Sequence, residues 1–294
     1  MTDIVPFTGK TLCQVNSELG EGPSYDPATD TAWWFDITGR KLHELHLSSS
    51  TKRVHDLPFM GSVIAVIDPA RQLIASDEGL FVRDTNSGKL EHLVTIEDKP
   101  GNRSNDGRVH QCGALWIGTM GCRAEKDAGA IYHVAGSKVT RLYSNISIPN
   151  SICFSPDGAT AYFTDTTVNK LMRVEVDPGT GLPTGSPEVL SEPKGHPGGL
   201  DGSVCDADGL IWNARWGAAT VDVYRPDGTK VQRYATPATQ ASCPAFIGAK
   251  ADRLLVTSAW QGMDEKAQAA DPDAGRTFEL GITVKGRFEP AFRL

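Results

Sequence analysis

Four oxygen-bearing side chains lie 84, 45 and 51 residues apart in the chain of 294 residues, namely Glu21, Asn105, Asn150 and Asp201. Each begins a short phrase of strand, turn and strand. Carboxylate and amide oxygens are hard donors that suit Ca²⁺, Mg²⁺, Mn²⁺ or Fe²⁺. If the phrases bring these side chains together, the carboxylates repel each other unless a cation compensates them. The pattern therefore predicts a metal site, and the alternative is that these residues only form turns that lead into strands.

The elements that would position these residues are six copies of one sequence repeat of strand, turn and strand. The copies begin at Glu21, Val63, Asn105, Asn150, Asp201 and about Ser242, so successive starts lie 42, 42, 45, 51 and 41 residues apart. Turn sequences such as "SPDG" and "RPDG" separate runs of alternating apolar and polar residues. This period is typical of propeller blades, each a four-stranded sheet, in which equal positions converge at one mouth of a central channel. We therefore predict an all-β, six-bladed β-propeller that forms a single domain over residues 1–294, and a pair of β-sandwiches is the alternative.

Two parts of this propeller have more than one interpretation. The segment "MDEKAQAADPDAG" (263–275) could contain a helical turn before its proline, but we interpret it as a loop. The sixth copy is the weakest. Either "TLCQV" (11–15) or "GRFEPAFRL" (286–294) could supply its closing strand, and the sequence does not distinguish between them.

The composition limits the partners of the protein. The formal net charge is −7 and basic residues form only short clusters such as "TKR". Nucleic acid and anionic membrane surfaces require concentrated lysine and arginine, so neither is expected as a partner. The chain has no run of 18 apolar residues, and its first residues do not resemble a signal peptide. We therefore expect a cytoplasmic protein, whose six cysteines are free, buried thiols.

Other catalytic patterns have little support. His43 and His46 are spaced as H-E-L-H rather than H-E-x-x-H and fall on a predicted strand, so we expect them at the surface. No G-x-S-x-G motif is present for a serine nucleophile. The sequence "DADG" (206–209) lacks the later ligands of an EF-hand loop and is interpreted as a hairpin turn. Four tryptophans are expected in the core between blades: Trp34, Trp116, Trp212 and Trp216. The alternative for Trp216 is a position at the rim of the pocket.

The segments that carry the candidate ligands resemble those of a known family. They are "LGEGPSYD" (19–26), "RSNDGRV" (103–109), "IPNSICFSPDG" (148–158) and "GGLDGSVCDADGLIWNARWG" (198–217). In this order and spacing they resemble the senescence marker protein, gluconolactonase and luciferin-regenerating enzyme family, or regucalcin family. The resemblance extends from about Leu12 to about Trp260. It implies a six-bladed propeller that binds one divalent metal ion at the mouth of its channel and hydrolyses sugar lactones.

Matching the motifs residue by residue implies two substrate contacts. Arg103 and Asn105 correspond to the residues that hold the hydroxyl groups and the lactone of the substrate. Ser104 stands between them, where the family usually has an aromatic residue. Arg123 stands where animal members have glutamate. We interpret Arg123 as a substrate contact that suits a more anionic substrate, and the alternative is a solvated loop charge.

The same matching implies that Glu21, Asn150 and Asp201 are the metal ligands. We therefore predict a divalent-metal-dependent lactonase of sugar catabolism that converts an aldonolactone, its small-molecule partner, to the aldonic acid, with Asp201 as general base. The alternatives are a regulatory or scaffold propeller that binds metal without turnover, and a hydrolase of another ester. The sequence leaves open which ion is bound (Ca²⁺, Zn²⁺, Mn²⁺, Mg²⁺ or Fe²⁺), which sugar and ring size are preferred, and the oligomeric state.

Overall fold

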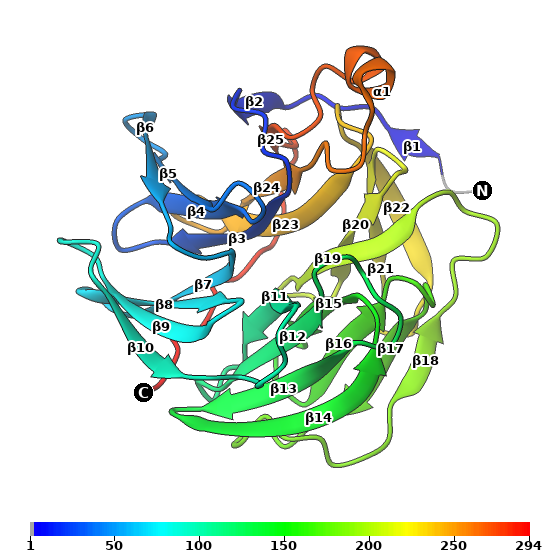
Figure 1. Cartoon of the computed structure of the whole chain (residues 1–294). Helices are drawn as coiled ribbons and strands as arrows, with labels where there is room; N and C mark the ends of the chain where they lie inside the picture. The colour runs from blue at the N-terminus through cyan, green and yellow to red at the C-terminus, as the bar shows by residue number, and fades with distance from the viewer. Residues whose placement is uncertain (1–2) are drawn as a thin grey trace.

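Six sheets of four or five strands form a closed ring in the computed structural model, which describes residues 3–294 (Figure 1). The innermost strands are β3 (Gly20–Asp26), β7 (Gly61–Asp68), β11 (Asn102–Val109), β15 (Pro149–Phe154), β19 (Gly199–Cys205) and β23 (Ala241–Ile247). Each contacts the innermost strand of the next blade, and β23 contacts β3, which closes the ring. The predicted six-bladed β-propeller is therefore confirmed. Each predicted repeat start lies near the beginning of one innermost strand.

The outer strands of blades 1 to 5 follow in chain order. Blade 1 contains β4 (Thr31–Asp36), β5 (Lys41–His46) and β6 (Thr51–Asp56). Blade 2 contains β8 (Arg71–Ser76), β9 (Gly79–Asp84) and β10 (Leu90–Val94). Blade 3 contains β12 (Leu115–Gly121), β13 (Gly129–Ala135) and β14 (Lys138–Ile146). Blade 4 contains β16 (Thr160–Asp165), β17 (Leu171–Glu175) and β18 (Glu188–Ser191). Blade 5 contains β20 (Ile211–Trp216), β21 (Thr220–Tyr224) and β22 (Lys230–Ala235).

Blade 6 is closed by a strand from the other end of the chain. After β23 come β24 (Arg253–Ser258) and β25 (Thr277–Glu279), and β2 (Lys10–Cys13) pairs with β25 as the outermost strand. Of the two candidate segments, "TLCQV" therefore supplies the closing strand. The short strand β1 (Ile4–Val5) pairs in parallel with β22 and widens blade 5. The N-terminal segment thus joins two neighbouring blades.

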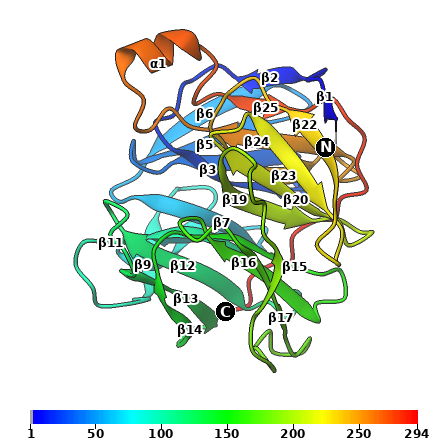
Figure 2. The same ribbon diagram turned by 90° about the vertical axis from the view of Figure 1, so that its right-hand side faces the viewer.

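The other candidate segment forms no strand but crosses the far end of the channel, where the innermost strands finish. We call residues 286–294 the tail; it is red in Figures 1 and 2. Its contacts reach all six blades: Gly286 with Ala251, Arg287 with Phe154 and Cys205, Phe288 with Tyr25, Glu289 with Arg108, Phe292 with Val66, and Arg293 with Gly113. The tail therefore ties the blades together on the side opposite to the repeat starts.

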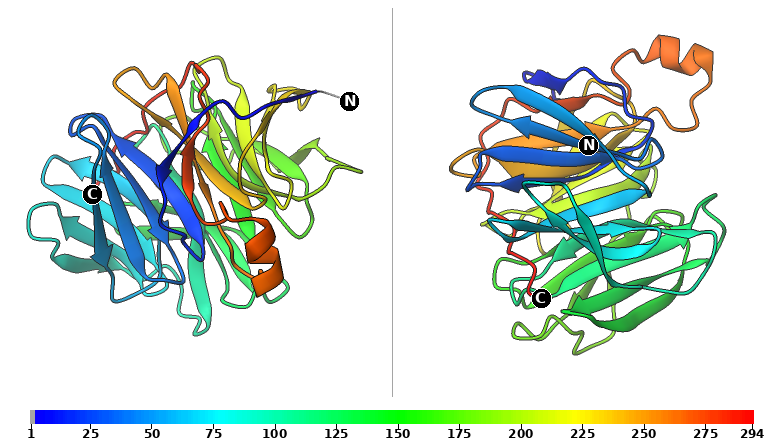
Figure 3. Two further views of the ribbon diagram at one scale, coloured as in Figure 1. Left: turned by 90° about the horizontal axis from the view of Figure 1, so that it is seen from above. Right: turned by 60° about the vertical axis from the view of Figure 1, so that its left-hand side comes forward.

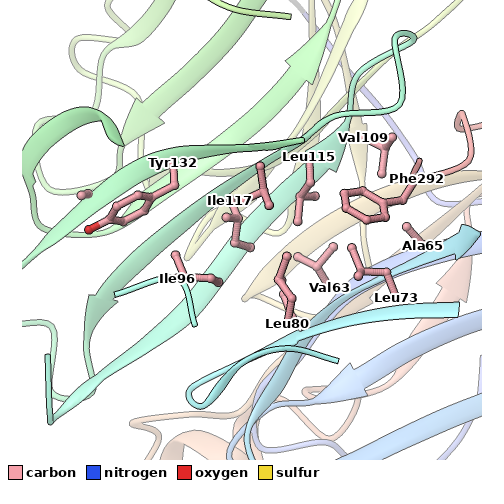
Figure 4. Close-up of a cluster of buried hydrophobic side chains, with 13 residues drawn as sticks. Val63, Ala65, Leu73, Leu80, Ile96, Val109, Leu115, Ile117, Tyr132 and Phe292 are labelled. Atoms are coloured by element: carbon pink, nitrogen blue, oxygen red, sulfur yellow. The ribbon is translucent and has the colours of Figure 1, made fainter. Parts of the chain in front are cut away.

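A buried apolar cluster between blades 2 and 3 holds the end of the tail (Figure 4). Val63 and Leu73 of blade 2 face Leu115 and Ile117 of blade 3, and Phe292 of the tail packs beside them with 1% of its surface exposed. Removing a phenylalanine side chain from water stabilises a fold by roughly 2–3 kcal/mol. Phe292 is therefore part of the core.

Two predictions about turns have different outcomes. Residues 206–209 form the hairpin turn between β19 and β20, in which the Gly209 amide donates to the Asp206 carbonyl at 3.1 Å, so that prediction is confirmed. The loop predicted over 263–275 is wrong in part, because α1 (Glu265–Ala270) lies within it. Asp264 caps this helix by accepting a hydrogen bond from the Ala267 amide at 2.8 Å. The helix stands out from the ring (Figures 2 and 3).

No helix in residues 3–294 is long and apolar enough to cross a membrane.

The buried surfaces between blades confirm the prediction for three tryptophans and contradict that for a histidine. Trp34, Trp116 and Trp212 are all buried, as predicted. The ring of Trp34 stacks on that of His43, with ring centroids 5.2 Å apart. His43 is itself buried, so its predicted surface position is wrong, whereas His46 at the end of β5 is half-buried. Because Trp34 packs against residues of blade 6, His43 is enclosed between the two blades.

The six cysteines are free, as predicted, but not all are buried. Four are buried: Cys13, Cys153, Cys205 and Cys243. Cys112 is half-buried and Cys122 is exposed, so the predicted burial is wrong for these two. Both lie in turns that follow strands of blade 3.

Candidate metal centre and pocket at the channel mouth

The three predicted metal ligands lie together at one mouth of the channel. Glu21, Asn150 and Asp201 belong to the innermost strands of blades 1, 4 and 5, and they line a pocket of about 400 Å³. Arg103 and Asn105 of blade 3 line the same pocket. All five side chains are at least nine-tenths buried. The repeat accounts for this meeting, because each residue has nearly the same position in its own blade.

A β-bulge begins directly after Glu21 and after Asn150, and a third contains Asp201. The pairing register shifts between Glu21 and Ser24, between Asn150 and Cys153, and between Leu200 and Ser203. Gly22 and Ser151, which follow two of the ligands, have left-handed backbones with φ of 55° and 60°. A Cβ atom on Gly22 would lie 1.9 Å from the carbonyl oxygen of Ser62, so only glycine fits there. Bulges of this kind redirect a side chain, here toward the pocket.

Burial dominates the electrostatics of the pocket. It raises the pKa of Glu21 to about 8, and the charge of Asp106 is the second cause. Burial also raises the pKa of Asp201 well above its usual value, followed by the charges of Glu21 and Asp106. Arg103 lowers both pKa values and Arg108 lowers that of Glu21, but these effects are smaller. The pocket therefore favours a bound cation, because a cation offsets the repulsion between carboxylates.

A hydrogen-bond network connects the predicted substrate contacts to one ligand. Arg103 Nη1 donates to Asn105 Oδ1 at 2.7 Å. Asn105 Nδ2 donates to Asn150 Oδ1 and to the Pro149 carbonyl, each at 3.0 Å. Both N–H groups of the Asn105 amide are therefore engaged within the protein, and a second lone pair on its Oδ1 is left for a substrate hydroxyl. Within residues 3–294, the Nε and Nη2 atoms of Arg103 have no hydrogen-bond partner and can donate to a substrate.

The donor set fits a hard divalent cation. Glu21 and Asp201 contribute two carboxylates. The amide oxygen of Asn150 accepts one hydrogen bond from Asn105 and keeps a second lone pair. Two carboxylates and an amide oxygen are ligands that Ca²⁺ and Mn²⁺ accept, and the remaining positions can be taken by water or substrate oxygens.

Arg123 lies at the rim of this pocket rather than inside it. Its side chain is 89% exposed, and its Nε contacts Glu125 Oε1 at 3.0 Å. The neighbouring Cys122 and Ala124 also line the rim. The carboxylate of Glu125 thus compensates the charge of Arg123, and any substrate group that Arg123 contacts lies at the solvent side.

Residues missed by the sequence analysis complete the wall of the pocket. Trp216 is half-buried and borders the pocket, which agrees with the alternative given for it rather than with a core position, but Thr166 and Gln261 were not identified. Thr166 Oγ1 accepts a hydrogen bond from Asn150 Nδ2 at 2.8 Å. Thr166 is the first residue after β16, and the strand pairing of the blade puts that position beside the start of β15. The repeat therefore places this residue beside Asn150, but no motif in the sequence marks its hydroxyl group.

Comparison with known proteins agrees with the four motifs. The family model for the SMP-30/gluconolactonase/LRE-like region matches residues 19–260. A protein of Rhizobium meliloti (strain 1021) named "Putative sugar lactone lactonase" is 76% identical over 294 residues, which is 100% of both chains. The L-arabinolactonase of Azospirillum brasilense is 35% identical over 273 residues, which is 91% of this chain and 89% of that protein.

A solved structure is similar over the whole propeller. The crystal structure of a calcium-binding protein, regucalcin, from Agrobacterium tumefaciens strain C58 is 61% identical, covers 100% of both chains and gives a TM-score of 0.99. The resemblance expected from the motifs is thus confirmed, and the chain belongs to the SMP-30/gluconolactonase/LRE-like family.

Proposed function

We propose that this protein hydrolyses a sugar lactone with the help of a divalent cation held by Glu21, Asn150 and Asp201. The observation that carries the proposal is the meeting of two buried carboxylates and an amide oxygen beside a guanidinium group in one pocket of about 400 Å³. A metal-binding role alone does not require Arg103 to be buried beside the ligands. The relatives that are named as lactonases support the substrate class.

Hydrolysis of a lactone requires water to attack the carbonyl carbon and the ring C–O bond to break. When bound, a divalent cation supplies Lewis-acid polarisation of a carbonyl and lowers the pKa of a water molecule. In the proposed reaction Asp201 accepts a proton from the attacking water at a carboxylate oxygen. It returns that proton to the ring oxygen as the C–O bond breaks, which leaves a hydroxyl group and a carboxylic acid. Arg103 donates hydrogen bonds to substrate oxygens and orients the ring.

The walls of the pocket suggest a monocyclic aldonolactone as the substrate. Polar side chains line the pocket together with the apolar side chains of Leu19, Met120 and Trp216. A sugar ring presents apolar C–H faces and polar edges, which match a lining of both kinds. We assign Arg123 to the part of the substrate that extends to the rim.

A chelator experiment tests the proposal. Stripped protein would be assayed by acid release on a panel of pentono- and hexonolactones, with each divalent ion added back. We expect hydrolysis of a subset of lactones that depends on the added ion. Asp201→Asn is expected to lose this turnover. Asp208→Asn, the same change at a residue 52% exposed, is expected to keep it. Turnover that is unaffected by chelation or by Asp201→Asn would contradict the proposal.

The second candidate is a metal-binding propeller without turnover. The calcium-binding description of the Agrobacterium tumefaciens protein favours it. The same experiment separates the two, because the second candidate predicts that ions bind to the stripped protein while no lactone of the panel is hydrolysed above its spontaneous rate.

A further inference from the structure

We propose that Thr166 is a positioning residue for the metal centre, because it sets which end of the Asn150 amide faces the cation. The inference rests on the proposed metal site. Thr166 lies in the turn after β16 and is half-buried at the pocket wall. Thr166 is not one of the candidate ligands, and its side chain carries no charge that could attract the cation.

Arg103 fixes the orientation of the Asn105 amide at one end of the hydrogen-bond network. A guanidinium group can only donate hydrogen bonds. Arg103 Nη1 lies 2.7 Å from the Asn105 amide, so the atom that faces it must be the oxygen, Oδ1. Asn105 Nδ2 therefore points the other way, toward the Pro149 carbonyl and Asn150, each at 3.0 Å. The atom of Asn150 that receives this bond must be its amide oxygen.

Thr166 and the Leu200 carbonyl form the opposite end of the network. Thr166 Oγ1 lies 2.8 Å from the carbonyl oxygen of Leu200, which can only accept. The single hydroxyl proton is used there. The contact of 2.8 Å between Thr166 and Asn150 must therefore be a bond that Asn150 Nδ2 donates. Two independent ends of the network thus require the same orientation of the Asn150 amide.

This orientation matters because the two ends of an amide have nearly the same shape and opposite polarity. If the Asn150 amide rotated by half a turn, its NH₂ group would face the cation and repel it. Thr166 opposes that rotation, because the rotated amide would turn its oxygen toward a hydroxyl whose proton is already donated to Leu200. Residues that orient a ligand in this way contribute strongly to metal affinity.

The other blades show that the propeller itself does not need a hydroxyl at this position. In four of them, the first residue after the second strand makes the backbone bond that Thr166 makes to the Ile148 carbonyl. These residues are Ile37, Asp77, Cys122 and Ala259, which donate to Leu19, Met60, Gly101 and Gln240. The shared feature is a backbone N–H, and the side chains range from methyl to carboxylate. The hydroxyl of Thr166 is therefore specific to blade 4, the blade that carries Asn150.

The network also reaches the third ligand. The Leu200 carbonyl, which accepts the hydrogen bond from Thr166, belongs to the peptide bond between Leu200 and Asp201. A single path of hydrogen bonds therefore runs from Arg103 on blade 3, through Asn105 and Asn150, to the strand that carries Asp201 on blade 5. We infer that Thr166 coordinates the orientation of one ligand with the backbone position of another.

The test is a calorimetric titration of Ca²⁺ and of Mn²⁺ into chelator-stripped full-length protein. We expect Thr166→Val to weaken binding of the ion by roughly 10–100-fold, as loss of a residue that orients a ligand does. Thr166→Ser, which restores the hydroxyl, is expected to recover the affinity. Thr38→Val is the matched control: it makes the same change in the corresponding turn of blade 1, where the hydroxyl has no hydrogen-bond partner in residues 3–294. Its affinity is expected to equal that of the wild type.

Thermal unfolding of the stripped variants separates positioning from folding. We expect Thr166→Val and the wild type to unfold at similar temperatures without an ion, because the fold accepts other side chains at this position. If the wild type binds an ion and Thr166→Val binds it equally well, the role of Thr166 is wrong and the metal site stands. If Thr166→Ser binds as weakly as Thr166→Val, the role is also wrong. If the wild type binds neither ion, the metal site and the role of Thr166 fail together.

Discussion

Glu21 predicts an unusual pH dependence for the stability of the metal-stripped protein. Burial raises its pKa from 4.5 to about 8 in the folded state, whereas the unfolded chain exposes the group at its ordinary value. The folded state therefore binds this proton more tightly. The resulting stability is present in full below the unfolded pKa and is lost as the pH rises through the folded pKa. We expect the free energy of unfolding of the stripped protein to fall between about pH 4.5 and about pH 8.

The pKa of Glu21 in the two states sets the size of this effect. At about 1.4 kcal/mol per pH unit, the interval corresponds to at most about 5 kcal/mol. Water entry and movement of Arg103 toward the carboxylate reduce the loss, so we expect about 2–4 kcal/mol. For a protein of this length that is a fall of roughly 4–8 °C in the midpoint of thermal unfolding. Added Ca²⁺ or Mn²⁺ should offset the fall, because it binds the ionised carboxylates.

The assay is thermal and urea unfolding of the stripped protein across this pH range, with Glu21→Gln measured in parallel. The amide does not titrate, so the variant should lose the Glu21 part of the slope and keep only the part that burial of Asp201 contributes. Glu265→Gln makes the same change at an exposed position and should leave the slope unchanged. Equal slopes for wild type and Glu21→Gln would refute the inference that the Glu21 carboxyl is protonated in the fold.

Three further predictions concern other parts of the molecule. Gly22→Ala should cost at least about 1 kcal/mol of stability and weaken ion binding, because φ is positive and the Cβ meets the Ser62 carbonyl; urea unfolding and calorimetry check this, and unchanged values would contradict it. Phe292→Ala should lower the free energy of unfolding by about 3–5 kcal/mol. The affinity of this variant for the ion should not change, because Phe292 lies at the far end of the channel. Urea unfolding and calorimetry check both values, and a weaker affinity would contradict the prediction. Arg103→Met should lower kcat/KM for the lactone by an amount that corresponds to roughly 1.5–3 kcal/mol of lost transition-state stabilisation, the value of a hydrogen bond to a charged group. Steady-state kinetics check this, and an unaltered kcat/KM would exclude the role of Arg103.

The sequence predicted the ring and the place of the site because both follow from the repeat. Glu21, Asn150 and Asp201 stand at the starts of repeats, which implied equal positions in their blades, and a closed ring brings equal positions together. Neither step required knowledge of any side-chain contact. The chemical roles proposed for these residues came from the resemblance of the four motifs, because spacing alone could not assign them.

Other features depended on contacts between segments far apart in sequence. His43 has the alternation of a surface strand, but the neighbouring blade covers it, and no pattern within β5 reveals that cover. Thr166 gains its importance from the Leu200 carbonyl of the next blade. The helix α1 is only six residues long, and its cap at Asp264 was outweighed by the nearby proline. For His43 and Thr166 the local pattern was correct about the strand or turn but contained nothing about its partner, whereas for α1 two local signals conflicted and the wrong one was preferred.

The tail gives the order of synthesis a physical meaning. Residues 286–294 contact every blade, yet they are the last of these residues to leave the ribosome. A nascent chain can therefore form the sheets of blades 1 to 5 while the segment that connects all six blades is still inside the exit tunnel or not yet synthesised. A chain that ended at residue 285 would retain every pocket residue and lose the tie, whereas Leu294, which is half exposed, leaves room for an added segment. Attachment at this end is expected to be tolerated where removal is not.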